Sequence, residues 1–407
     1  MRQARSRAAA LRGGLASLLC AILFCAVLPW LSGCTDSPDG AISQADVEVE
    51  ALPPLEEVSA IRDLALTPAG GVWILNTAAP RLLLQHRDGR LVTAFGRTGE
   101  GPQQLGFPAA IVEASDTSVT VHDRKRNALR TFDLDGVEVA STPLEGVRTL
   151  VPSDLDYVLA GSPFLTTMEG TLTEGALLLS DFPEARRPGT AHLWNRQIVR
   201  VRPEPAVVEV IADFREERDR FAEELSGASI LVPAPLWASC PDGTVALYMP
   251  FRNEVRWMGG RAVVSTPESP RPLASREVVA AVRGRITSGP QPAPMSESEI
   301  EAAIPMAVRQ LGSEMSSTAP AYVEMACGYG SVAWLQRFSV EHDWLGRGEE
   351  IDLVWPDGRL MRLRVPRGFR LLRFDGDTLL GVLRDAFDVE QPGLLRVDRV
   401  LIDTMAP

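Results

Sequence analysis

Residues 64–95 read LALTPAGGVWILNTAAPRLLLQHRDGRLVTAF, and this stretch decides the fold. Apolar residues alternate with other residues on both sides of Gly70-Gly71 and again on both sides of Asp88-Gly89. Gly-Gly or Asp-Gly between two alternating runs is the strongest short signal of a β-hairpin, because a type I′ turn needs positive φ at both central residues. The stretch therefore predicts four antiparallel strands in two linked hairpins.

The same unit recurs along the chain. Its downstream hairpin returns, with Asp-Gly or Gly-Gly in the turn, at 128–142, 254–266 and 350–365. Its upstream hairpin returns at 110–121, 236–248 and 323–335. Alignment of the upstream turns places one valine of each unit at the same position: Val72, Val119, Val245 and Val332. The first two of these valines are 47 residues apart. Four strands per repeat at this spacing are typical of a β-propeller blade.

Two further repeats are looser. One runs from 146–164 to 196–214 with a long insertion between, and the last, over 369–402, supplies only three strands. The N-terminal segment 45–52 (ADVEVEAL) alternates cleanly and is the natural fourth strand of the last blade. This pairing would close the ring and protect the edges of the first and last blades. We therefore predict an all-β, six-bladed β-propeller of four-stranded blades over 45–407, with small helical insertions.

Several segments resemble NHL-type six-bladed propellers. They are FGRTGEGP (95–102), LGFP (105–108) and VHDRKRNALRTFDLDG (121–136). The C-terminal WPDGRLMRLRVPRGFRLL (355–372) looks like six-bladed lipoproteins of uncertain function found in some Gram-negative bacteria. The likeness is good over 60–145 and 235–400. It implies the fold and says little about function, because propellers host many unrelated functions.

The N-terminus has the pattern of an export signal. Four arginines and no acidic residue stand in the first twelve positions, and an apolar run covers 15–31. The sequence LSGC (31–34) resembles the lipobox of bacterial lipoproteins. The resemblance implies a signal peptide over 1–33, acyl chains such as palmitate on Cys34 and a linker over 34–44. The alternative is an uncleaved membrane helix, since the run approaches the ~20 residues that a span needs.

Lipid on Cys34 would make the membrane a partner, because several acyl chains hold a protein firmly on a bilayer. We expect the outer membrane of a Gram-negative bacterium, with the protein facing the periplasm or the cell surface. Removal of 1–33 takes away four arginines and no acid, so the formal net charge changes from −12 to −16. Such an acidic surface repels phosphate backbones, which argues against a nucleic-acid partner.

Two helical insertions are predicted between strands. The first lies near 214–226 and is charged on most sides. The second spans about 275–312, where Ser296 and Glu299 fit a capping box and Pro305 should kink or restart the helix. The second insertion is interpreted as a blade connection that packs its apolar stripe on the ring. The alternative is an arm that binds a partner.

Residues that could carry chemistry are few. Of the four histidines, only His122 lies near an inner hairpin with an acid beside it, Asp123. This pair is a weak candidate for a metal or catalytic role, and an edge-strand residue is the simpler interpretation. Cysteines at metal-ligand spacing are absent from 34–407, and the sequence has no G-x-S-x-G motif. The sequence therefore predicts no catalytic residue, no metal and no cofactor.

Cys240 and Cys327 occupy equivalent positions, each three residues before the turn glycine of its unit. They are expected on the innermost strands of successive blades. A disulfide needs Cα atoms within about 7 Å, and neighbouring blades diverge toward the rim. Two small buried apolar residues are therefore the favoured interpretation, with a bridge as the alternative.

These features favour an exported, lipid-anchored propeller that acts as a non-catalytic binding or scaffold protein at the cell envelope, with a protein or glycan partner. The alternative is a metal-dependent propeller enzyme of the lactonase or lyase kind. The mouth of the central channel discriminates between them: convergent Asp, Glu, Asn or His side chains would favour the enzyme. A bare apolar patch on one face would favour the binding protein.

Overall fold

The computed structural model describes residues 42–99, 101, 103–123, 125–126, 128–143, 164–168, 171–180, 196–202, 207–213, 231, 233–258, 262–288, 295–311, 317–340, 346–385 and 389–397. The signal peptide, Cys34 and the helix predicted near 214–226 lie outside these ranges. Residues 44–407 form one compact unit. Within the described residues, no helix is both long and apolar enough to cross a membrane.

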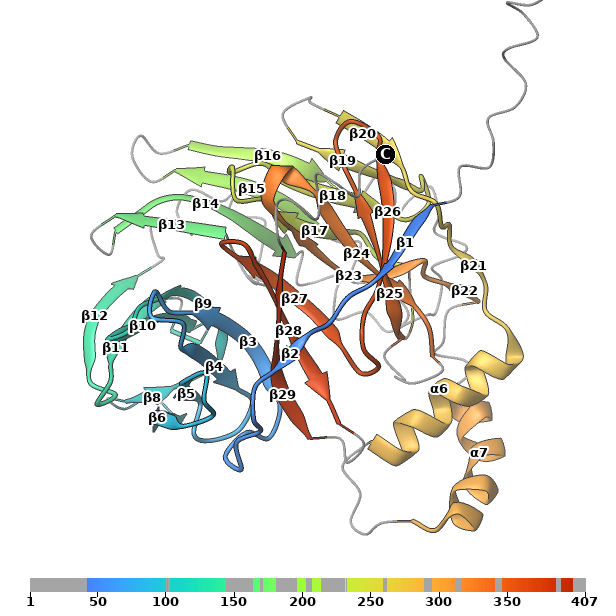
Figure 1. Ribbon diagram of the computed structural model, residues 1–407, viewed down its shortest axis with the longest axis horizontal. Coiled ribbons are helices and arrows are strands. Elements are labelled where there is room, and N and C mark those ends of the chain that lie inside the picture. The colour runs from blue at the N-terminus through green and yellow to red at the C-terminus, as the bar shows by residue number, and fades with distance from the viewer. Residues whose placement is uncertain are drawn as a thin grey trace, which may run out of the picture. The chain divides into compact units, whose positions relative to one another are not determined.

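The described strands of this unit form a β-propeller of six antiparallel blades (Figure 1). Blade one holds β3 (Ile61–Leu66), β4 (Val72–Asn76), β5 (Leu82–Gln85) and β6 (Leu91–Phe95). Blade two holds β9 (Pro108–Ala114), β10 (Ser118–Asp123), β11 (Ala128–Asp133) and β12 (Glu138–Pro143). Blade three holds β13 (Phe164–Met168), β14 (Thr171–Ser180), β15 (Arg196–Arg202) and β16 (Val207–Asp213).

Blade four holds β17 (Leu236–Ser239), β18 (Val245–Met249), β19 (Glu254–Trp257) and β20 (Ala262–Ser265). Blade five holds β23 (Tyr322–Cys327), β24 (Ala333–Phe338), β25 (Arg347–Val354) and β26 (Leu360–Arg364). Blade six holds β27 (Arg370–Asp375), β28 (Thr378–Arg384) and β29 (Glu390–Arg396). Short ribbons join some blades: β7 (Arg97–Thr98) with β8 (Gln104–Leu105), and β21 (Arg271–Pro272) with β22 (Thr318–Ala319).

The first two strands of blade three lie at other residues than predicted. The stretch expected to be an insertion between 164 and 196 instead contributes β13 and the long strand β14. Both strands carry threonines, which favour extended backbone. The hairpin is present, but it lies later in the chain than the alternation over 146–164 indicated.

The N-terminal segment closes the ring, as expected for 45–52. Its strand β2 (Glu50–Ala51) pairs with β29 and completes blade six. Leu52 follows and is buried in a core cluster shared by blades one and six, which Figure 1 shows side by side (blue and red). The segment also does something that was not predicted: β1 (Ser43–Asp46) adds a fifth strand to blade five, next to β26.

Glycine occupies the tight turns because they need a residue with positive φ, as predicted, but the turns are not of type I′. Gly89 donates its N–H to the carbonyl oxygen of His86, which leaves a three-residue loop, and its φ is 89°. Gly136 repeats this geometry in blade two, with φ of 73°. Among the described residues, no aspartate has positive φ, so the predicted type I′ turn is wrong at both places. One glycine in the left-handed region is enough for a three-residue loop with a bulge, whereas type I′ needs positive φ at the aspartate as well.

Tryptophans connect neighbouring blades. Trp73 of β4 is fully buried and donates its indole N–H to the carbonyl oxygen of Ser115 in blade two, at 2.9 Å. Trp257 of β19 makes the same kind of bond to Ser331 in blade five, at 2.6 Å. Large apolar rings with one satisfied polar atom are well suited to such interfaces. Blades one and two therefore share one apolar core cluster, and blades four and five share another.

The second helical insertion consists of α6 (Ser275–Ser288) and α7 (Glu297–Leu311). Glu299 accepts the N–H of Ser296, as in the predicted capping box. Pro305 lies inside α7, which continues for six more residues to Leu311. Apolar residues of both helices pack with Phe338 and Val340 of blade five. This packing supports the interpretation of the insertion as a blade connection.

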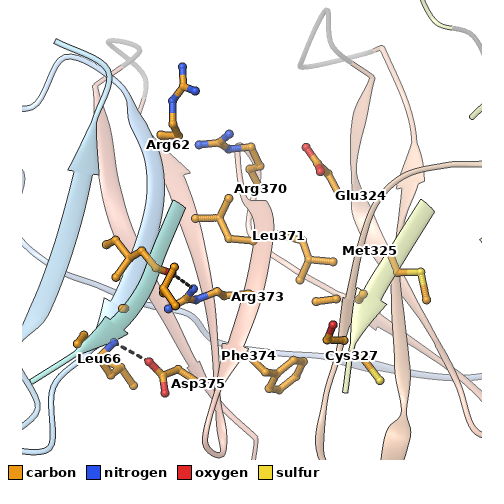
Figure 2. A pocket seen from close by; sticks show the side chains of 18 of the residues that line it. Arg62, Leu66, Glu324, Met325, Cys327, Arg370, Leu371, Arg373, Phe374 and Asp375 are labelled. Atoms are coloured by element: carbon orange, nitrogen blue, oxygen red, sulfur yellow. Dashed lines mark hydrogen bonds between the residues drawn. The ribbon is translucent and has the colours of Figure 1, made fainter. Parts of the chain in front are cut away.

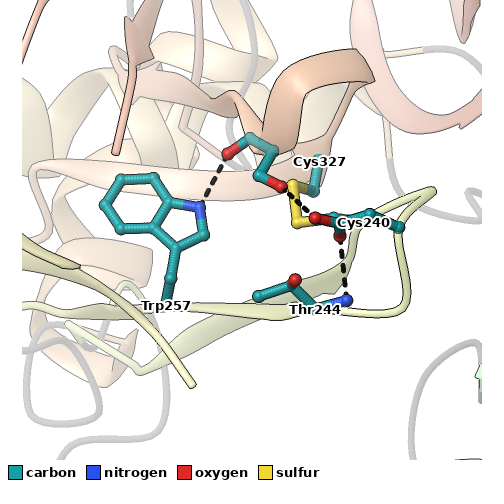
Figure 3. Close-up of a disulfide and its surroundings, with 6 residues drawn as sticks. Cys240, Thr244, Trp257 and Cys327 are labelled. Carbon is teal, nitrogen blue, oxygen red and sulfur yellow. Dashed lines mark hydrogen bonds between the residues drawn. A yellow bond between two sulfur atoms is a disulfide. The ribbon is translucent and has the colours of Figure 1, made fainter. Parts of the chain in front are cut away.

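Cys240 and Cys327 form a disulfide, with their Cα atoms 4.7 Å apart (Figure 3). The favoured interpretation of two separate thiols was therefore wrong. Cys240 directly follows β17 and Cys327 ends β23, which are the innermost strands of neighbouring blades. Inner strands converge toward the axis, so equivalent positions there come within bridging distance, in contrast to positions near the rim.

Candidate functional site

A pocket of about 680 Å³ lies between the innermost strands of the blades. Its described walls come from β3, β9, β17, β23 and β27, which are the first strands of five different blades. Sites for small molecules usually have volumes of roughly 300–1,000 Å³. Residues more than 300 positions apart in sequence meet here, since Arg62 and Arg370 both line the pocket. The central pocket is therefore the candidate functional site.

Three charged side chains mark one end of this pocket, which we call the arginine end: Arg62, Glu324 and Arg370 (Figure 2). The guanidinium group of Arg370 donates to the carbonyl oxygen of Ile61 and so ties β27 to β3. The guanidinium carbon of Arg62 lies 4.9 Å from the centre of the Phe107 ring. The ring covers one face of that guanidinium and attracts its positive charge. Both cations are thus held in place by neighbouring groups.

Carboxylates near the arginine end have arginine partners of their own. Glu324 Oε1 lies 3.2 Å from Nε of Arg347. Glu390 Oε1 lies 2.7 Å from Nη2 of Arg384, and its other oxygen accepts the N–H of Ile61 at 2.6 Å. Both acids are therefore engaged with arginines other than Arg62 and Arg370.

The charge of the two arginines at the arginine end is incompletely compensated. Burial lowers the pKa of Arg370, and the positive charge of Arg347 lowers it further, while the nearby glutamates act in the opposite direction. Burial also lowers the pKa of Arg62, and Arg81 adds to this effect. A lowered arginine pKa means that the surroundings disfavour the charged form. Because arginine stays charged at neutral pH, an anion bound here would be stabilised.

A third arginine serves the fold. Arg373 Nη1 donates to the carbonyl oxygen of Ile111 at 2.7 Å and lies 3.5 Å from Asp63 Oδ2. Asp63 is buried and accepts the N–H groups of Ile111 and Leu64, at 2.8 and 2.9 Å. Burial raises the pKa of Asp63, although Arg373 and these two donors act against it. The pair joins the inner strands of blades one, two and six.

The opposite end of the pocket is formed by Leu66, Cys327, Phe374 and Asp375 (Figure 2). Asp375 Oδ2 accepts the N–H of Leu66 at 2.8 Å, across the junction of blades six and one. The Phe374 ring packs edge-on against Trp334, with ring centres 5.0 Å apart. The carboxylate at this end therefore stabilises a blade junction.

His122 and Asp123 do not line the pocket. Both are fully buried in β10, the second strand of blade two. Asp123 accepts the N–H groups of Gly106 and Phe107, each at 2.9 Å, and lies 3.3 Å from Nη1 of Arg130. Burial raises its pKa, but these three donors outweigh burial, so the pKa of Asp123 is below its ordinary value. Asp123 thus fixes the loop that places Phe107 against the arginine end.

No group of three His, Cys, Asp or Glu side chains that could hold a metal ion is found among the described residues. The side chains that do converge, Arg62 and Arg370, were missed by the sequence interpretation. Each stands near the start of an inner strand that is otherwise mostly apolar, and Glu324 is the third residue of β23. A charge at the start of an inner strand was the signal that could have found them.

Comparison with known proteins gives neighbours of the fold. No protein-family model and no curated protein matches the chain, so the likeness to NHL-type propellers stays a prediction. A member of the DUF4221 family from Bacteroides vulgatus is 9% identical, with a TM-score of 0.47 over 87% of this chain and 98% of that chain. The calcium-binding protein regucalcin from Agrobacterium tumefaciens is 14% identical, with a TM-score of 0.41 over 87% and 95%.

Virginiamycin B lyase from Staphylococcus aureus is 11% identical, with a TM-score of 0.36 over 86% of this chain and 99% of that chain. At these identities a likeness concerns the fold alone. The propeller fold of this chain rests on the composition and order of its own sheets.

Proposed function

We propose that this chain is an exported, lipid-anchored propeller that binds a small molecule, or the end of a glycan, in its central pocket without converting it. The pocket between the inner strands is the observation that carries the proposal. Export and the anchor are supported by the arginine-rich start, the apolar run and LSGC (31–34). Placement at the outer membrane of a Gram-negative envelope is part of the proposal.

A binding role is supported by the partners of two of the three acids in the wall, Glu324 and Asp375; the third, Glu113 of β9, is exposed. Asp375 accepts a backbone N–H at a blade junction, and Glu324 pairs with Arg347. General acid–base catalysis needs a carboxyl or imidazole group within reach of the reacting atoms and able to exchange its proton. Here Asp375 joins blades six and one, and the Glu324–Arg347 pair lies within blade five, so both carboxylates already have partners in the fold.

The test fills the pocket with a bulky side chain. Val112 is a half-buried wall residue of β9, and Val112→Trp should reduce the space for a ligand. Val92→Trp is the matched control, because Val92 is 41% exposed on β6, the outer strand of blade one. Purified full-length protein in detergent is screened by thermal shift against neutral sugars, sugar acids, sugar phosphates and short peptides.

We expect at least one of these probes to raise the melting temperature of the wild type and of Val92→Trp, with the rise lost in Val112→Trp. Mass spectrometry of the probe after incubation, with and without added Ca²⁺ or Mg²⁺, should return it unchanged. Ring opening or elimination in the probe would refute the non-catalytic role and support a lactonase- or lyase-like enzyme. Failure of every probe to bind would refute the pocket as the site.

A further inference from the structure

Most of the well-buried arginines in the described structure have carboxylate partners. Arg130 lies between Asp123 and Glu138, and Arg362 pairs with Asp352. Arginine is favoured for such pairs because its planar group matches a carboxylate. These contacts show how the chain normally compensates a guanidinium group that it removes from water.

Arg62 and Arg370 depart from this pattern. Among the described residues, neither makes an ion pair: Arg370 donates to a backbone carbonyl, and Arg62 stacks on Phe107. A guanidinium group carries five N–H donors, so most of the donors of Arg370 are left for another acceptor. Both side chains line the same pocket and stand at the same end of it (Figure 2).

The surroundings add to the positive charge at this end. The charged neighbours of Arg370 include Arg347, Arg384, Glu324, Glu390 and Asp63. The three acids pair with Arg347, Arg384 and Arg373, so the charges of Arg62 and Arg370 remain as an excess. The chain as a whole carries a formal net charge of −12. A local positive excess in an acidic protein attracts an anion into a low-dielectric pocket, where electrostatic attraction is strong.

From this geometry we infer that Arg62 and Arg370 form an anion subsite at one end of the pocket, which takes the carboxylate or phosphate group of a small acidic ligand. The inference rests on the proposed function, and it names the chemical class of the ligand. Phe107 acts as a positioning residue, since it holds the plane of the Arg62 guanidinium. Asp123 acts one step further away, through the backbone N–H of Phe107.

Isothermal titration of the full-length protein in detergent tests this inference with four probes. Galacturonate and glucose 6-phosphate carry the two kinds of anion, and galactose and glucose are their neutral counterparts. We expect at least one anionic probe to bind at least tenfold more tightly than its neutral counterpart. Higher salt should lower the affinity for that anionic probe. The arm that binds tells a carboxylate ligand from a phosphate ligand.

Arg62→Gln and Arg370→Gln should each lower the affinity for the anionic probe about tenfold. A hydrogen bond to a charged group contributes roughly a factor of ten or more to binding. Arg97→Gln is the matched control, because Arg97 is exposed on β7, away from the pocket wall. Arg370→Lys keeps the charge and should lose less affinity. This variant also keeps the test informative if Arg370→Gln fails to fold. Phe107→Leu should lower the affinity for the anionic probes and leave the affinity for the neutral probes unchanged.

The two proposals fail in different ways. If neutral probes bind as well as anionic ones and Val112→Trp blocks both, the pocket binds ligands but the anion subsite is refuted. If an anion binds and neither glutamine variant changes its affinity, the subsite is likewise refuted. If no probe of any class binds, the proposed function and the anion subsite are both refuted.

Discussion

Loss of the bridge between Cys240 and Cys327 is expected to destabilise the propeller while leaving its fold intact. The bridge joins the inner strands of blades four and five across 87 residues of sequence. Those residues include three strands of blade four and the helical insertion α6–α7. Without the bridge, the unfolded chain gains the freedom of this whole loop.

The magnitude follows from chain entropy. For a separation of 87 residues, the entropy of closing the loop corresponds to about 4.6 kcal/mol at 25 °C. Measured values usually fall below this figure, because native strain and residual structure in the unfolded chain reduce the gain. We therefore expect the free energy of unfolding to fall by about 2–4 kcal/mol.

Urea unfolding followed by tryptophan fluorescence measures this effect. Three samples are compared: oxidised wild type, wild type refolded in reductant, and the double variant Cys240→Ala/Cys327→Ala. Both cysteines are buried, so the double variant also loses packing. The reduced wild type keeps both side chains and isolates the bridge. Equal urea midpoints for oxidised and reduced wild type would refute the reasoning.

Three further predictions concern the ring, the anchor and a buried acid. Deletion of 45–52 removes β2, unpairs the edge of blade six and should cost several kcal/mol, whereas an unchanged melting temperature would contradict closure by this segment. Cys34→Ser should abolish the lipid mass on the mature N-terminus and release the protein from membranes or leave it unprocessed, and an intact wild-type N-terminus at Met1 would contradict the anchor. The pKa of Asp123 is lowered in the folded state, so its charge stabilises the fold above about pH 4 and this contribution is lost as the pH falls through the folded value. Asp123→Asn should therefore be less stable than wild type at pH 7, with the gap narrowing toward about pH 3; a constant gap in urea unfolding at both pH values would rule this out.

Local signals in the sequence were sufficient for much of the fold. Turn glycines such as Gly89 and Gly136 act within a few residues, and their spacing predicted both the hairpins and the repeat. The alternation of 45–52 predicted its pairing with the last blade, because an alternating segment needs a partner strand. Where alternation was weak, over 146–196, the position of the hairpin was wrong. The type of turn was wrong too, since Asp-Gly suits a bulged three-residue loop as well as type I′.

Contacts between blades could not be predicted in this way. Cys240 and Cys327 occupy equivalent positions in their repeats, but equivalence does not say how far apart two inner strands lie. The sequence shows that residue 123 is an aspartate. Only the tertiary structure shows that its carboxylate accepts the backbone N–H groups of Gly106 and Phe107.

The sequence by itself determined the repeat, the hairpins of the regular blades and the closure of the ring, because hairpin turns and side-chain alternation act over a few residues. The tertiary structure alone decided the disulfide and the candidate site. Arg62 and Arg370 stand more than 300 residues apart and meet because the ring brings the first and last blades together. Their distance in space depends on the curvature and twist of all the blades between them. A local sequence pattern does not predict that distance.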